Sequence, residues 1–187
     1  MKLLLIITAI CCATIFTNCT GVAAGNAKAA VIDTVYACLP CGSGCDTLAY
    51  TTLGMCNHCH MQLVDKRRIT HKTITPQQLC STNSSQVIFL DVRTAEEFNG
   101  TALEKFGAIK NAINIPVQEL ERRMSELELY KNKPVIVYCS HSHRSPSASY
   151  MLTQAGFKNV TNMSGGMSVW KEQVTDSGCN KKLYQPQ

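Results

Sequence analysis

Two continuous apolar runs, separated by the signals of helices, constrain the fold of this chain more than any other feature. The runs cover residues 87–90 and 135–138, and neither alternates with polar residues as a strand with one solvated face would. Such runs fit strands that are buried on both faces of a sheet. The sequence therefore predicts an α/β domain in which a central parallel sheet is flanked by helices.

The expected helices are marked by their first residues and by apolar spacing. Capping boxes begin at Thr75 and Thr94, each with Gln or Glu three residues later. A helix is expected over residues 147–154 and a third strand over residues 159–163. Another helical face carries Val117, Leu120, Met124 and Leu127.

Cys139 directly follows the second apolar run, at the carboxyl end of a strand, where functional groups gather in parallel sheets. The loop that it begins reads Cys-Ser-His-Ser-His-Arg-Ser-Pro and precedes a helix. Loop amides and a helix N-terminus favour a thiolate. A structural cysteine is the alternative, but a purely structural turn rarely carries two His, one Arg and three Ser. We therefore expect the Cys139 thiol to lie exposed at the floor of a pocket, ringed by inward-facing amides.

Four stretches in order across residues 71–175 resemble single-domain rhodanese (thiosulfate sulfurtransferase-like) proteins. They are Leu-Asp-Val-Arg with Glu-Phe at 90–98, Gly-Ala-Ile with Asn-Ile-Pro at 107–116, the strand that ends in Cys139, and Gly-Phe through Trp at 156–170. The resemblance implies a rhodanese-like three-layer fold. It also implies that Cys139 is the catalytic nucleophile and carries a persulfide, that Asp91 and Arg93 brace the active site, and that Arg144 closes the loop.

Loop length separates two chemistries on this fold. By resemblance, sulfurtransferases use six residues from Cys to Arg, whereas related phosphatases and arsenate reductases use one more. Cys139 to Arg144 is six residues, which argues against a phosphatase. The other positions of the predicted active-site loop are Ser140, His141, Ser142, His143 and Ser145. Two of them depart from the family, which by resemblance has a basic residue in place of Ser140 and a glycine in place of Ser142.

The expected reaction is a double displacement without a cofactor. Cys139 takes sulfane sulfur from thiosulfate, a polysulfide or a persulfide and passes it to a thiol or to cyanide. Two other classes stay open, namely a non-catalytic module that binds persulfide or a partner, and a metal or redox sensor. Cys80 and Cys179 flank the domain and could resolve the persulfide, pair with each other, or stay structural or free thiols.

Residues 35–65 form a cysteine-rich module. Cys38/Cys41 and Cys56/Cys59 are two Cys-x-x-Cys pairs separated by fourteen residues. Two such pairs predict a zinc-ribbon-like site with a structural zinc, since about 30 residues rarely hold a fold without such a staple; copper is a second choice. Disulfides and a redox-active pair are the alternatives. Three further residues are surplus to the predicted site: Cys45, His58 and His60.

Residues 1–24 have the charge and apolar run of an export signal. We expect lipidation at Cys19 and a membrane anchor on the periplasmic side of a bacterial envelope. Simple cleavage after Ala24, which would release the protein to the periplasm, and a retained signal are the alternatives. Residues 25–34 read as a linker and 176–187 as a C-terminal tail.

Composition limits the remaining possibilities. A chain of 187 residues with 45% apolar residues supports one domain of roughly 100–150 residues and a smaller module. The net charge of +5 has no concentrated basic stripe, so no nucleic-acid partner is expected.

Overall fold

The computed structural model describes residues 34–187. The predicted signal over 1–24, Cys19 and nearly all of the linker over 25–34 lie outside the described residues. Within the described range, no helix is both long enough and apolar enough to cross a membrane.

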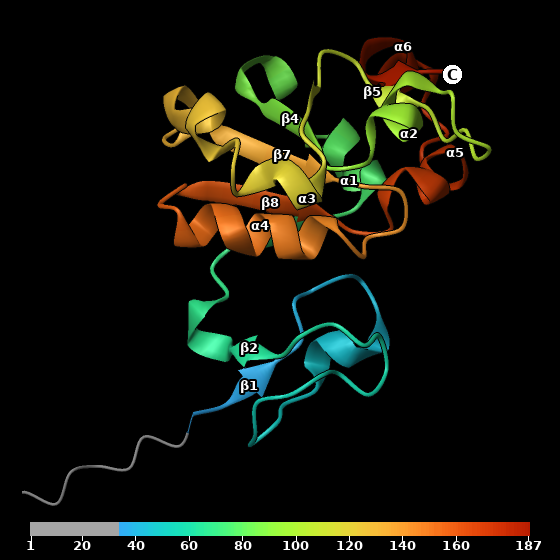
Figure 1. The fold of residues 1–187 in the computed structure, drawn as a ribbon. Coiled ribbons are helices and arrows are strands. Elements are labelled where there is room, and N and C mark those ends of the chain that lie inside the picture. Colours follow the sequence, from blue (N-terminus) through green and yellow to red (C-terminus); the bar gives the residue numbers. More distant parts are fainter. Residues whose placement is uncertain (1–33) are drawn as a thin grey trace, which may run out of the picture. The chain divides into compact units, whose positions relative to one another are not determined.

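A five-stranded sheet forms the centre of the larger domain (Figure 1). The strand order is β3-β8-β7-β4-β6, and every neighbouring pair is parallel. The bounds of the strands, in chain order, are β3 (Lys72–Ile74), β4 (Ile88–Asp91), β6 (Ile113–Asn114), β7 (Pro134–Tyr138) and β8 (Asn159–Met163). The predicted fold class, an α/β domain with a central parallel sheet flanked by helices, is confirmed.

Helices cover both faces of this sheet because its central strands are apolar on both sides. Val135 and Val137 of β7 pack into one core, and Ile136 and Tyr138 pack into the other. The first core contains side chains from α3 (Val117–Leu120) and α4 (Ser145–Gln154). The second core contains side chains from α1 (Pro76–Cys80), α5 (Trp170–Gln173) and α6 (Ser177–Leu183).

Local signals in the sequence account for most helix starts. Both predicted capping boxes are present, at Thr75 for α1 and at Thr94 for α2 (Ala95–Asn99). The apolar face expected over residues 117–127 is not one helix. It is divided between α3 and the 3₁₀ helix η4 (Met124–Tyr130), although Leu120 and Leu127 are buried as expected. Two other short 3₁₀ helices are η3 (Ser84–Gln86) and η5 (Gly166–Val169).

Residues 176–187 were expected to form a tail, but they belong to the packing of the domain. They form α6 and β9 (Tyr184–Gln185), and β9 pairs with β5 (Ala108–Ile109). Trp170 stacks on Tyr184 and donates a hydrogen bond from its indole nitrogen to Asn180 at 2.8 Å. The polar sequence of this segment concealed the apolar residues that anchor it.

The cysteine-rich segment has little regular structure. It contains the two-stranded antiparallel pair β1 (Tyr36–Ala37) and β2 (Val64–Asp65), with the 3₁₀ helix η1 (Gly44–Thr47) between them and η2 (Lys66–Arg68) after β2. Its buried core consists largely of the cysteines themselves, with Leu63 as the one buried aliphatic side chain of that cluster in the described residues.

A disulfide joins Cys80 at the end of α1 to Cys179 in α6, across 99 residues of sequence. We expect the double variant Cys80→Ser/Cys179→Ser to lose about 2–5 kcal/mol of unfolding free energy, because the cross-link restricts the unfolded chain. Urea denaturation measures this loss. Wild type and variant should be equally stable once the disulfide is reduced, and equal stability before reduction would contradict the prediction.

Candidate active site

The loop that follows β7 is built as an amide cradle at the carboxyl edge of the sheet. Cys139 is the first residue after β7, and α4 begins six residues later at Ser145. None of the backbone N–H groups of residues 140–144 donates a hydrogen bond to an acceptor within residues 34–187. Arg144 stands at the N-cap of α4, and its side chain does not cap the helix. Several unpaired donors and a helix N-terminus therefore belong to the loop that begins at Cys139.

The expected exposure of the thiol is wrong. Cys139 is only 1% exposed and packs at the edge of the core between the sheet and α4. Its Sγ lies 3.4 Å from the Ser145 hydroxyl oxygen. Ser140 and Ser142 of the same loop are also buried, whereas His141 and His143 are exposed. A reactant reaches the buried thiol only when the atoms that cover it move.

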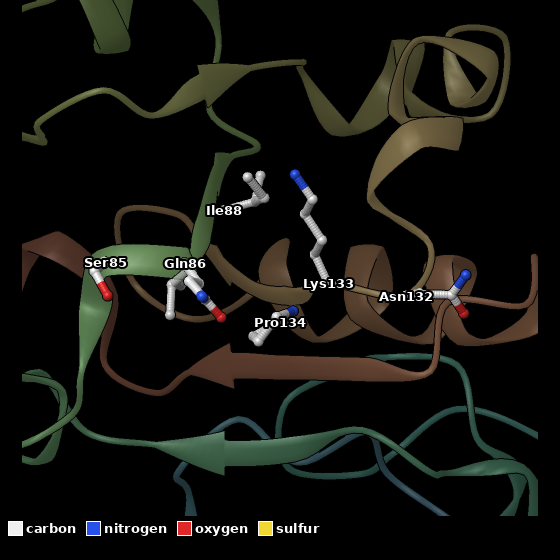
Figure 2. A pocket seen from close by; sticks show the side chains of 7 residues that line it. Ser85, Gln86, Ile88, Asn132, Lys133 and Pro134 are labelled. Atoms are coloured by element: carbon white, nitrogen blue, oxygen red, sulfur yellow. The ribbon is translucent and has the colours of Figure 1, made fainter.

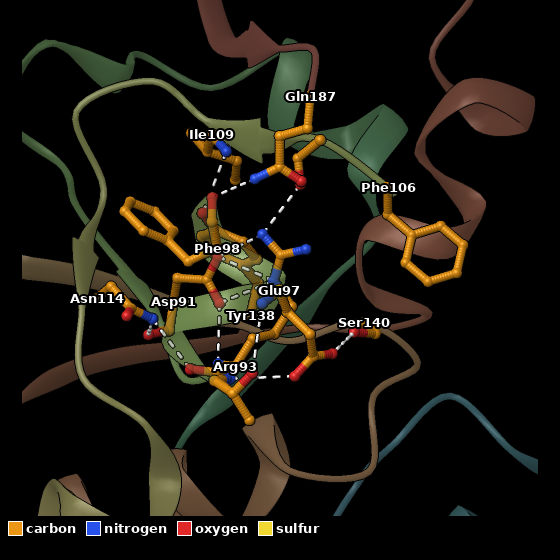
Figure 3. A network of polar contacts seen from close by, with 12 residues as sticks. Asp91, Arg93, Glu97, Phe98, Phe106, Ile109, Asn114, Tyr138, Ser140 and Gln187 are labelled. Atoms are coloured by element: carbon orange, nitrogen blue, oxygen red, sulfur yellow. Dashed lines mark hydrogen bonds and ion pairs between the residues drawn. The ribbon is translucent and has the colours of Figure 1, made fainter. Parts of the chain in front are cut away.

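Glu97 of α2 holds this loop, and sequence reasoning did not select it as a site residue. Its carboxylate accepts two hydrogen bonds from the Arg144 guanidinium, at 2.6 and 2.7 Å. It also accepts one from the Ser140 hydroxyl at 2.6 Å (Figure 3). The hydrogen bonds from Arg144 lower the pKa of Glu97 to about 2, against burial that raises it. Arg144 is therefore bound to an acidic partner 47 residues earlier in the chain.

Asp91 and Arg93 form a fully buried ion pair at the end of β4. The Arg93 guanidinium donates to both oxygens of Asp91 and to the carbonyl of Gly107 at 2.9 Å (Figure 3). The Cζ atom of Arg93 lies 5.8 Å from the centroid of the ring of Tyr138, the residue before Cys139. Neither side chain makes a hydrogen bond to residues 139–145 in the described structure, so the pair braces the strand ends from which the loop departs.

Comparisons with known proteins show what this chain is similar to. The protein-family model described as the rhodanese-like domain matches residues 76–173 of the sequence. The thiosulfate sulfurtransferase GlpE of Coxiella burnetii is 30% identical over 95 residues, which are 51% of this chain and 81% of that protein. A sulfurtransferase of Allochromatium vinosum is 33% identical over 88 residues, which are 47% of this chain and 75% of that protein. The crystal structure of a rhodanese-related protein from Thermoplasma volcanium shares 34% identity, with a TM-score of 0.47, and covers 55% of this chain and 93% of that one.

The chain belongs to the rhodanese-like family. The match spans more than half of the chain and contains the whole loop from Cys139 to Arg144. It ends before α6 and β9, which the structure adds to the packing of the domain.

Two backbone positions of the rhodanese-like domain show why its loop can close so tightly. Gly166 has a φ of +68°, and a Cβ at this position would lie 2.3 Å from the Ser140 carbonyl oxygen, so only glycine fits. Ser142 takes the loop position where the family has glycine, and it keeps the left-handed backbone with a φ of +60°. The Ser142 hydroxyl is buried without a partner among the described residues. The loop thus accepts strain to keep its shape.

A separate cavity of about 490 Å³ lies at the other end of the sheet. It is lined by residues beside the amino ends of β4 and β7, including Ser85, Lys133 and Pro134 (Figure 2). The lining carries one charged side chain and no nucleophilic cysteine. The cavity therefore lacks the groups that the chemistry of Cys139 needs.

Of the four predicted metal ligands, the structure gathers Cys38, Cys56 and Cys59 in one group with Cys45. The fourth, Cys41, lies in a second group with Cys45 and Asp46. His58 and His60, the other surplus residues, stay exposed outside the cluster. The four-cysteine cluster has the composition of a metal site.

Replacing Glu97 with Gln tests its hold on the loop. A Gln at this position keeps an oxygen for the Thr94 N–H but loses the charge that pairs with Arg144. Because the folded-state pKa is lowered, the stabilisation is present above the ordinary value of 4.5 and is lost as the pH falls toward about 2. We expect Glu97→Gln to cost about 1–3 kcal/mol of unfolding free energy at neutral pH, a difference that shrinks through this window.

Urea denaturation at a series of pH values measures the difference. Glu96→Gln is the matched control, because Glu96 is exposed in the same helical turn and has no side-chain bond to the loop. It should change stability by no more than about 0.5 kcal/mol. A Glu97→Gln difference that stays constant down to pH 2 would contradict the assigned role.

Proposed function

We propose that this protein is a sulfurtransferase that carries sulfane sulfur as a persulfide on Cys139. The observation that carries the proposal is a cysteine at the end of β7 inside a six-residue loop whose amides have no acceptor among the described residues. Membership in a family whose relatives include thiosulfate sulfurtransferases supports it.

In the first step the Cys139 thiolate attacks the outer sulfur of the donor. With thiosulfate, a bond forms between Sγ and the outer sulfur, the bond between the two thiosulfate sulfurs breaks, and sulfite leaves with the electron pair. The product is a Cys139 persulfide anion. Unpaired loop amides and the N-terminus of α4 stabilise this negative charge.

In the second step a nucleophilic acceptor attacks the outer sulfur of the persulfide. With cyanide the products are thiocyanate and the free Cys139 thiolate, so the enzyme returns to its starting state. Arg144 is already paired with Glu97, and the amides therefore carry most of the interaction with the anion. Opening of residues 140–143 exposes the sulfur to both reactants.

The test is sulfur transfer by wild type and by Cys139→Ser. Wild type should form thiocyanate from cyanide with thiosulfate or polysulfide, and the rate should fall roughly a thousandfold or more in the variant. Intact mass after donor treatment should rise by about 32 Da in wild type alone and return after reduction. Cys41→Ser should behave as wild type. Transfer that survives Cys139→Ser, or no transfer and no mass gain in wild type, would contradict the proposal and favour a non-catalytic module.

We also propose that the cysteine-rich segment holds a structural zinc ion.

A third proposal concerns location. We propose that the protein works outside the cytoplasm of a bacterium and is lipid-anchored through Cys19. The apolar run and Cys19 in the sequence support the location. The Cys80–Cys179 disulfide supports it independently, because such bonds persist mainly in oxidising compartments.

The location is tested by cell fractionation in a bacterial host. Wild type should be recovered with the membrane, and Cys19→Ala should lose this association because the acyl chains that anchor the protein cannot be attached. Cys12→Ala, which changes another cysteine of the predicted signal, is the control and should stay with the membrane. Recovery of wild type in the soluble periplasmic fraction would favour simple secretion.

A further inference from the structure

We propose that Cys38, Cys45, Cys56 and Cys59 are the four ligands of one zinc ion, and that Cys41 is not a ligand. This assignment deepens the proposed zinc site and does not depend on sulfur transfer by Cys139. The sequence predicted two Cys-x-x-Cys pairs as ligands. The proposed set keeps the pair Cys56/Cys59 and combines it with Cys38 and Cys45, which are seven positions apart.

The four sulfur atoms have the closeness and burial that a tetrahedral ion requires. All four lie within 4.8 Å of one another. Zinc–sulfur bonds of about 2.3 Å place neighbouring sulfurs about 3.8 Å apart, so the cluster needs only small shifts to receive the ion. The closest pair, Cys38 and Cys59, is separated by 3.1 Å and would open by about 0.7 Å. Cys38, Cys45 and Cys56 are at most 1% exposed.

The Cys41 sulfur lies within 4.8 Å of Cys45 and of Asp46, but it does not belong to the group of four sulfurs. The Asp46 carboxylate accepts hydrogen bonds from the backbone N–H groups of Cys41 and Gly42, at 3.0 and 2.8 Å. The Cys41 thiol lies 3.6 Å from the same carboxylate. A thiol can donate to a carboxylate there, but a metal-bound thiolate would face a like charge. The turn at Cys41 therefore points its sulfur to a proton-accepting partner, and η1 brings Cys45 to the metal position instead.

The second pair has the backbone of a metal-binding turn. His60, directly after Cys59, has a φ of +56°, a position usually taken by glycine. The His60 N–H donates to the Cys56 carbonyl at 2.9 Å, and the Cys56 N–H donates to the Met61 carbonyl at 2.8 Å. These bonds hold Cys56 and Cys59 on one side of a tight turn. The side chain of His60 is exposed and takes no part in the cluster.

The segment also needs such an ion to stay folded. Two strands of two residues each and the buried aliphatic side chains of Ala37, Leu39 and Leu63 are too little to order about 30 residues. Buried cysteines without a cross-link supply only weak packing. One ion bound by four thiolates supplies the missing free energy, because metal binding and folding are coupled.

The decisive experiment uses the full chain with Cys41→Ser, loaded with Zn²⁺ and, separately, with Co²⁺. This variant keeps four cysteines in the segment, so four-sulfur coordination then requires Cys45. We expect one zinc per chain by elemental analysis, as in wild type. The Co²⁺ complex should have the same tetrahedral absorption and the same thiolate charge-transfer intensity as wild type.

Cys45→Ser is the complementary variant and should lose one thiolate from the Co²⁺ spectrum, with zinc affinity at least tenfold weaker. If it fails to fold, the Cys41→Ser spectrum decides alone. A loss of thiolate intensity in Cys41→Ser would overturn the assignment, as would two metal ions per wild-type chain. The assignment would also be overturned if the wild-type protein contained no metal and its mass were lowered by the hydrogen atoms lost when cysteines of the segment form disulfides. Sulfur transfer measured in the same samples reports separately on Cys139.

Discussion

A parallel sheet that is buried on both faces exposes unpaired backbone groups where its strands end, and the loop after β7 depends on that constraint. Side chains of β7 alternate between two cores, each closed by helices. The backbone N–H groups of the loop after β7 lie beyond the carboxyl end of the strand. They have no hydrogen-bond acceptor among the described residues. Unpaired amides are costly unless an acceptor meets them. In the proposed reaction, an anionic sulfur on Cys139 is the acceptor that meets them.

The loop keeps this costly arrangement because neighbouring contacts hold it from several sides. Glu97 serves two purposes, since its carboxylate completes the cap of α2 and also binds Arg144 and Ser140. The buried pair of Asp91 and Arg93 holds the end of β4 beside Tyr138. Gly166 lets the chain after β8 approach the loop carbonyls. Strain at Ser142 is tolerated because these contacts leave the loop little alternative.

The cysteine-rich segment follows a different physical rule. The rhodanese-like domain is held together by apolar packing and one long-range disulfide. The small segment instead buries sulfur atoms in place of hydrocarbon. One chain thus contains cysteines in three chemical roles, as a candidate nucleophile, as a cross-link and as a cluster of metal-ligand type. What separates these roles is the set of groups around each sulfur.

The sequence by itself determined the elements that depend on neighbouring residues. The strands over 87–90, 135–138 and 159–163 and the caps at Thr75 and Thr94 were predicted to within a residue or two, because apolar runs and capping boxes act over a few residues. The position of Cys139 at the end of a strand followed from the same local patterns. Only the tertiary structure decided the burial of Cys139, the pairing of Arg144 with Glu97, the Cys80–Cys179 bond and the grouping of Cys45 with Cys38, Cys56 and Cys59. Each of these depends on side chains that packing brings together, and spacing along the chain does not contain that information.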